Sequence, residues 1–158
     1  MELSIEDSLN NGIEAHKAGQ IQKADNYYTS ILCSNPRHPD ANHNKGVLLA
    51  GTGRVQEALS FFKKALEANF GVVQYWHSYV ETLFKLGHCN EAKEVLAQAR
   101  ELVAKSAGLD ELEKWTEQQT LLDENKTFFE QKYSKTLKSI LKLLQFRIIR
   151  ESICKIYL

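Results

Sequence analysis

The sequence holds few residues that break helices and few that cross-link a chain. Two prolines, one methionine and three cysteines occur among 158 residues. Scarce proline leaves long stretches free to form helices, because proline lacks a backbone donor and clashes inside a helix. Cys33, Cys89 and Cys154 are odd in number and far apart, which indicates neither a disulfide framework nor a zinc site. We therefore expect reduced thiols in a cytoplasmic protein.

Export signals and motifs for chemistry are also missing. No run reaches the roughly 18 apolar residues that a membrane-spanning helix needs, and the first residues are acidic, unlike a secretory signal. No nucleophile motif or close pair of metal ligands is present. Gly51-Thr52-Gly53 is not followed by the lysine of a phosphate-binding loop. The sequence therefore predicts a protein without enzymatic activity, cofactor or metal.

Charge is unevenly distributed along the chain. Twenty basic and twenty acidic residues give a net charge of zero, but the segment from Gln131 onward holds seven basic residues and one acid, a net charge of +6. Such a split indicates an anionic partner for this basic tail, or a contact between tail and body. Internal packing is the favoured interpretation. A membrane surface is less favoured and nucleic acid least.

What the sequence does contain is a repeat of 34 residues. Four kinds of position recur three times at this interval, in phase with one another. They are Gly19, Gly53 and Gly87; Ala24, Ala58 and Ala92; Tyr28, Phe62 and Leu96; and Ile31, Ala65 and Ala99. Apolar residues at helical spacing lie on either side of each glycine, so each repeat reads as helix, turn, helix. This period predicts a helical solenoid.

At these residues the chain resembles tetratricopeptide repeats. Trp76 stands at the family's large residue, Gly46 at its helix glycine and Pro36 at its closing proline, whereas Lys45 replaces a leucine and Phe70 a proline. The resemblance implies an all-α, right-handed α-solenoid in which residues 1–106 form three units, 5–38, 39–72 and 73–106.

The remainder is expected to close the solenoid. Leu109, Leu112 and Trp115 form a narrow apolar stripe in an acidic segment, which favours a capping helix over residues 107–119. Residues 120–158 are expected to form a degenerate fourth hairpin and the basic tail. The last part, residues 146–158, has no clear periodicity.

The resemblance also implies a groove, lined by the first helix of each unit. Its positions in this chain include Leu9, Ile13, His16, Lys17, Asp40, His43, Asn44, Val47, Gln74, His77, Glu81 and Lys85. Its histidines are either a hydrogen-bonding strip for a peptide or scattered exposed imidazoles. Of the positions with which family members grip a chaperone's terminal carboxylate, only Asn44 matches, so that ligand is disfavoured.

Two functional hypotheses follow. The first is a scaffold or adaptor that binds a peptide or helix of another protein in the groove. The second is an acceptor-recognition arm of a truncated sugar- or sulfo-transferase, because residues 38–69 are similar to the N-terminal repeats of such bacterial enzymes. Exposed aromatic residues in the C-terminal segment add self-association as a further prediction.

Overall fold

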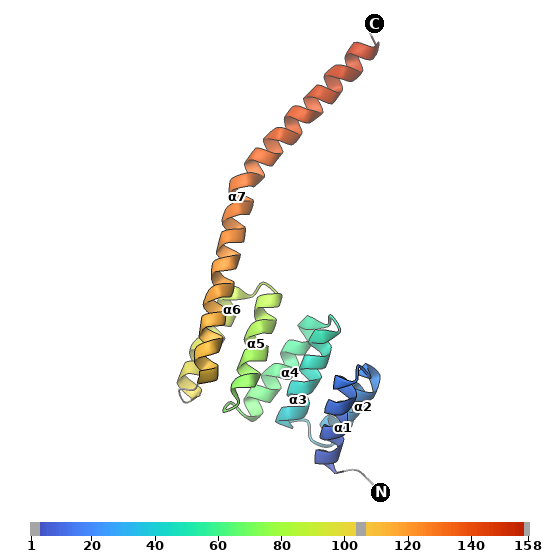
Figure 1. The fold of residues 1–158 in the computed structure, drawn as a ribbon, viewed down its shortest axis with the longest axis vertical. Coiled ribbons are helices and arrows are strands. Elements are labelled where there is room, and N and C mark those ends of the chain that lie inside the picture. The colour runs from blue at the N-terminus through green and yellow to red at the C-terminus, as the bar shows by residue number, and fades with distance from the viewer. Residues whose placement is uncertain (1–3, 104–106, 157–158) are drawn as a thin grey trace. The chain divides into compact units, whose positions relative to one another are not determined.

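The computed structural model describes the backbone of residues 4–103 and 107–156, and in the last helix it describes the side chains of residues 108–136 and of Ser139. This part of the chain forms seven helices and contains no strand (Figure 1). They are α1 (Ile5–Lys17), α2 (Ile21–Ser34), α3 (Pro39–Gly51), α4 (Val55–Ala68), α5 (Val73–Lys85), α6 (Cys89–Leu102) and α7 (Ala107–Ile156). Each predicted 34-residue unit therefore holds one helical hairpin.

The three hairpin turns share one geometry. Gly19, Gly53 and Gly87 have φ angles of 71°, 84° and 77°, in the left-handed region that glycine adopts without strain. In each turn the N–H of the residue after the glycine donates to a carbonyl in the last turn of the first helix. Arg54 N, for example, lies 2.9 Å from Leu49 O. The spacing of glycine in the sequence therefore sets the spacing of the turns.

Within a hairpin, a small residue on the first helix faces a large one on the second. A Cβ atom at Gly46 would lie 2.6 Å from Cε1 of Phe62, and one at Gly12 would lie 2.6 Å from Cε1 of Tyr28. The third hairpin has Val80 where the others have glycine, and the smaller Leu96 occurs at the aromatic position. Larger and smaller partners thus compensate, and the helices pack closely in all three hairpins.

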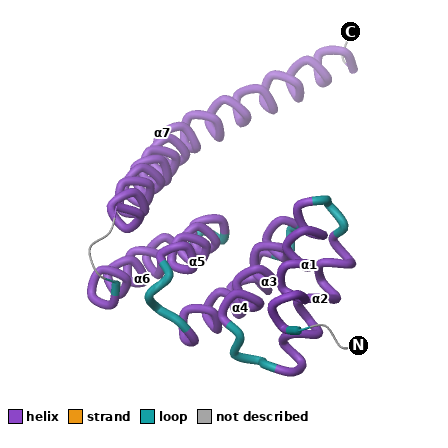
Figure 2. The backbone as a smooth tube through the Cα atoms, turned by 60° about the horizontal axis from the view of Figure 1, so that its bottom comes forward, coloured by secondary structure: helices purple, strands orange, loops and turns teal. Residues whose placement is uncertain are grey.

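The hairpins follow one another so that first helices neighbour first helices. Contacts join α1 to α3 and α3 to α5, while α2 contacts α3 and α4 contacts α5 (Figures 1 and 2). Two units divide the chain, Met1–Thr116 and Glu117–Leu158. In the first unit, Leu109 and Leu112 at the start of α7 are buried in the core of the third hairpin, together with Val95 and Val103.

The fourth hairpin predicted for residues 120–158 is wrong. Helix α7 runs without a turn from Ala107 to Ile156, so residues 107–119 are the start of a longer helix and no hairpin turn follows them. The physical reason is that residues 109–156 contain no glycine and no proline, the residues that end a helix or open a turn. Residues 146–156, which lacked a clear pattern, continue the helix; residues 157–158 lie outside the described residues.

Candidate peptide-binding face

All twelve predicted groove residues come from α1, α3 and α5, the first helix of each hairpin. We call the side of these helices that carries them the α1/α3/α5 face. Five of the residues are exposed, six are half-buried and one is buried. The exposed ones are Lys17, Asp40, Val47, Gln74 and Lys85; the half-buried ones are Leu9, Ile13, His16, Asn44, His77 and Glu81; the buried one is His43.

His43 is a structural residue and not part of the open surface. Its side chain is 9% exposed, its Nε2 lies 2.9 Å from Oγ of Ser78, and its ring stacks on Tyr75 with centroids 4.8 Å apart. Burial lowers the pKa of His43, so the imidazole is held neutral. The prediction that His43 is open to a ligand is therefore wrong, because the next hairpin covers its ring.

A second tie joins the same two hairpins. The hydroxyl of Tyr75 donates to Oδ1 of Asp40. Tyr75 is 3% exposed, and its burial, with the hydrogen bond to the Asp40 carboxylate, raises the pKa of the phenol. Asp40 keeps an exposed edge, but its orientation is fixed by the tyrosine. The two ties hold α3 and α5 in register and make this part of the face rigid.

A recess opens on the face between α5 and the start of α7. Its volume is about 420 Å³, and its lining includes Gln74 and His77 from α5 with Glu111 and Trp115 from α7. The rings of His77 and Trp115 are 5.8 Å apart. Among the described residues, no hydrogen-bond partner reaches the buried Nδ1 of His77, and the nearest carboxylate oxygen, on Glu81, is 4.0 Å away. The recess thus offers an amide, an imidazole and an aromatic wall.

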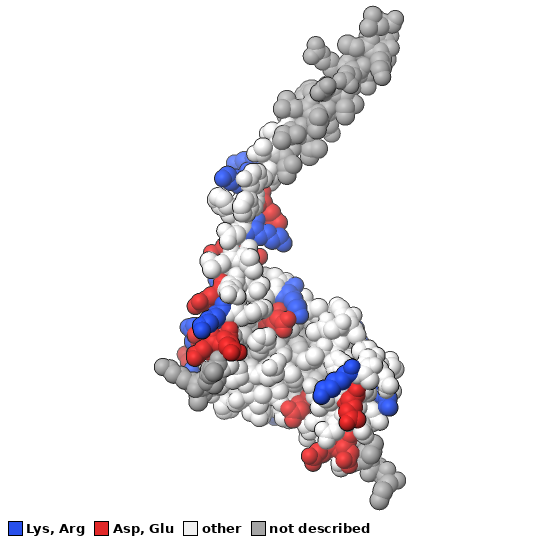
Figure 3. All heavy atoms as spheres, in the orientation of Figure 1, with Lys and Arg blue, Asp and Glu red and all other residues white. Residues whose placement is uncertain are grey.

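Charge on the face is balanced. Lys17 and Lys85 are offset by Asp40 and Glu81, and Lys85 Nζ is paired with Glu81 at 2.8 Å. Figure 3 shows that much of the repeat surface turned toward the viewer carries neither acids nor bases, and that the charged groups there are of both signs. A ligand for this face therefore needs no strong charge of its own.

Comparison with known proteins finds a family that part of the chain resembles. Residues 15–78 match the sequence model described as tetratricopeptide repeat. The matched segment makes up 64 of the 158 residues and runs from the first hairpin into the third. No curated protein sequence gives a significant match to it.

Several solved structures share the fold. One is a mutant Thermobaculum terrenum O-GlcNAc transferase, with 22% identity and a TM-score of 0.57 over 65% of this chain and 20% of the transferase. The TPR2B domain of yeast Sti1 in complex with pHsp70 has 19% identity and a TM-score of 0.67 over 75% of this chain and 97% of that one. The Yersinia enterocolitica type III secretion chaperone SycD, in complex with a peptide of the translocator YopD, has 15% identity and a TM-score of 0.66 over 78% of this chain and 94% of SycD. The chain thus spans a fifth of the transferase and nearly all of the other two.

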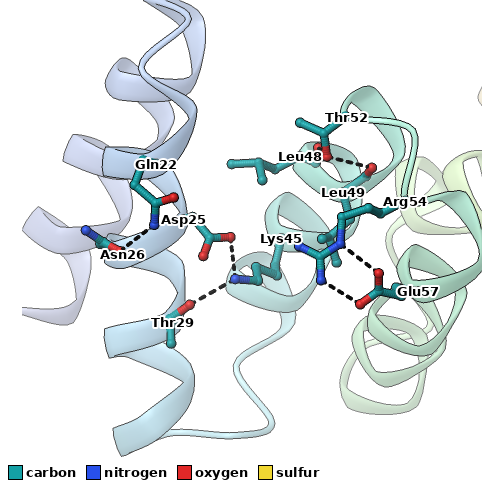
Figure 4. A network of polar contacts seen from close by, with 10 residues as sticks. All are labelled: Gln22, Asp25, Asn26, Thr29, Lys45, Leu48, Leu49, Thr52, Arg54 and Glu57. Atoms are coloured by element: carbon teal, nitrogen blue, oxygen red, sulfur yellow. Dashed lines mark hydrogen bonds and ion pairs between the residues drawn. The ribbon is translucent and has the colours of Figure 1, made fainter.

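Lys45, which replaces the family's leucine, has a role in joining repeats. Its Nζ donates to Oδ1 of Asp25 and, at 2.9 Å, to Oγ1 of Thr29, both on α2 of the preceding repeat (Figure 4). The Lys45 side chain is 12% exposed. An ion pair and a hydrogen bond therefore join the first and second hairpins at this position.

The structure also has a cleft that the sequence did not reveal. It has a volume of about 480 Å³ and is formed by α4, α5 and α6, away from the predicted groove residues. Phe70, 53% exposed, stands at its rim, and Glu67, Glu91 and Glu94 line it with one lysine, Lys63. Phe70 was the available signal, since it occupies the position at which the family has proline.

The residues that the structure describes include no group of three histidine, cysteine or acidic side chains that could hold a metal ion. Over the same residues, no helix has both the length and the apolar character needed to span a bilayer.

Proposed function

We propose that this chain is a non-enzymatic adaptor or scaffold that binds a peptide or helix of another protein on its α1/α3/α5 face. The observation that carries the proposal is the recess beside Gln74 and His77, which places an amide and a partly exposed imidazole next to the half-buried Val73 and Trp115. Pockets that combine an apolar wall with a few polar groups are typical of specific binding. A cytoplasmic location is part of the proposal and rests on the widely spaced cysteines.

Tetratricopeptide structures with bound peptides support this function by analogy of fold. The SycD structure contains a peptide of YopD, and the Sti1 domain is in complex with pHsp70. The ligand proposed here differs from a carboxylate terminus. Ser78, at one of the positions where family members place a cation for that group, is 7% exposed and engaged by His43.

Peptide selection followed by binding measurements tests the proposal. Short peptides would be selected from a display library on the immobilised chain, and the affinity of the best one measured by fluorescence anisotropy. The double substitution Gln74→Ala/His77→Ala should weaken binding at least about tenfold, which corresponds to about 1.4 kcal/mol. Circular dichroism would establish that the variant remains helical.

The matched control is Lys63→Ala/Gln98→Ala, which also removes two polar side chains but lies in the cleft of α4, α5 and α6. It should bind the selected peptide as the unaltered chain does. Selection of no peptide, or a loss of binding confined to the control variant, contradicts the proposed face.

A second candidate function is an acceptor-recognition arm of a sugar- or sulfo-transferase. The similarity to the O-GlcNAc transferase supports it, since this chain aligns with a fifth of that protein. Reading the gene beyond the codon for Leu158 tests this candidate. An in-frame or frameshifted transferase sequence supports it, and its absence leaves the adaptor as the function to pursue.

A further inference from the structure

The part of α7 in the second unit carries an exposed apolar surface. Leu122, Phe129 and Tyr133 are 62%, 54% and 47% exposed, and their spacing places them on one face of the helix. Leu121 and Phe128, 59% and 57% exposed, lie beside them. We call these five residues the α7 apolar patch. Large apolar groups gathered in this way are uncommon on the surface of a protein that remains alone in solution.

The patch is ordered by contacts within the helix. The rings of Phe129 and Tyr133 are stacked, with centroids 5.7 Å apart and an angle of 8° between planes. Phe128 packs edge-on to Phe129 at 6.0 Å, and Nζ of Lys132 lies 5.4 Å from the centre of the Phe128 ring. A partner therefore meets a rigid aromatic surface, which lowers the entropy lost on binding.

Charge changes sign along the helix between Glu130 and Gln131, inside the patch but toward its C-terminal end. Residues 117–130 contain four acids and one lysine, a net charge of −3, whereas residues 131–156 contain seven basic residues and one acid, a net charge of +6. Two such helices side by side in parallel place +6 against +6. When the two helices run in opposite directions and cross near residue 130, residues 117–130 of each lie along residues 131–144 of the other, which carry four lysines.

From the patch and this charge pattern we propose that two copies of the chain associate through α7 in an antiparallel pair that crosses near residue 130, within the α7 apolar patch. The pair has twofold symmetry, in which the same surface of both copies is used. The sequence supports a longer contact, because Leu137, Ile140 and Leu144 continue the helical spacing of Leu122, Phe129 and Tyr133. This association leaves the peptide-binding proposal independent, since the α1/α3/α5 face belongs to the other unit.

Sedimentation equilibrium of the full chain tests the association. The unaltered chain should sediment as a dimer, and Leu122→Glu/Phe129→Glu, which places charges in the patch, should sediment as a monomer. The control is Thr127→Glu/Gln131→Glu, because it adds the same charge at exposed positions on the opposite side of the helix. It should remain dimeric, and circular dichroism should show equal helix content in all three.

Direction is tested by a distance between two labels. A spin label at Glu117→Cys, in a chain whose native cysteines are changed to serine, reports the separation of residue 117 in the two copies. At about 1.5 Å of rise per residue, an antiparallel pair separates the labels by about 30 Å or more, and a parallel pair by about 10 Å. The short distance overturns the proposed direction.

Two further results overturn the proposal as a whole. One is that the unaltered chain is a monomer. If that monomer binds vesicles of anionic lipid through the same residues, the membrane and not a second copy occupies the patch. The other is that the patch variant and its control dissociate equally, because the added charge alone, and not the loss of the apolar contact, would then explain the dissociation.

Discussion

Nε2 of His43 lies 2.9 Å from Oγ of Ser78, and this contact joins the second hairpin to the third. Both side chains are buried, at 9% and 7% exposure. Each satisfies a polar group of the other that burial has removed from water, and a buried group without such a partner costs about 1–3 kcal/mol. The contact therefore positions α3 against α5. These two helices carry most of the proposed binding face.

The burial of His43 predicts a stability that depends on pH. Burial lowers the pKa of His43 in the folded protein, while the unfolded chain keeps the ordinary value of about 6.5. Below that pH the unfolded state binds the proton more readily, so the free energy of unfolding falls as the pH falls from about 7.5 toward about 5.5. Urea unfolding at several pH values measures this decrease.

The double substitution His43→Phe/Ser78→Ala isolates the effect. It removes both partners together and retains an aromatic ring against Tyr75, so no buried polar group is left alone. Its free energy of unfolding should fall less over the same pH interval, because His43 is gone. Some decrease can remain, because the other four histidines are present in both proteins. An identical decrease in the two proteins contradicts the assignment to His43.

The repeats were predictable because one residue type governs each local event. A glycine in the left-handed region ends the first helix of every hairpin, and a small residue opposite a large one sets how closely the two helices pack. Both requirements act within 34 residues, so they recur in the sequence at the period of the structure. The order and approximate length of the first six helices follow from that period.

The candidate site was less predictable, because it depends on contacts between repeats. The family register assigned His43 to the groove, but Ser78 and Tyr75 of the next repeat determine that it is buried. In α7, the apolar spacing of residues 137–144 was consistent with a hairpin, whereas the absence of glycine and proline was the stronger signal. The cleft at Phe70 depends on the packing of three helices, which the sequence of one repeat does not specify.

The close approach of Gly46 to Phe62 predicts that Gly46→Ala is destabilising. The new Cβ would lie 2.6 Å from the ring, so helix or ring must shift, at a cost of about 1–3 kcal/mol. Gly51→Ala in the same helix is the control, because no atom lies within 4 Å of its added Cβ. That change should be neutral or stabilising by up to about 1 kcal/mol. Urea unfolding compares them, and equal effects contradict the packing argument.

The turn at Gly53 predicts a cost of a different origin. Its φ is 84° and nothing lies within 4 Å of an added Cβ, so Gly53→Ala introduces backbone strain without a clash, worth about 1–2 kcal/mol. Gly53→Asn should cost less, because asparagine adopts the left-handed region more readily. Thermal unfolding of both variants measures the difference. If alanine is tolerated as well as asparagine, strain is not what selects glycine in this turn.

The start of α7 is predicted to stabilise the third repeat. Leu112 is 1% exposed and lies in the same core cluster as Val95 and Leu96 of α6, and the last repeat of a solenoid needs its apolar end covered. Leu112→Ala should therefore reduce the free energy of unfolding by about 2–5 kcal/mol. Leu102→Ala, at a leucine that is 50% exposed, removes the same atoms and should cost about 1 kcal/mol or less. Both changes are measured in the intact chain. If Leu112→Ala costs as little as Leu102→Ala, α7 does not close the core of the third repeat.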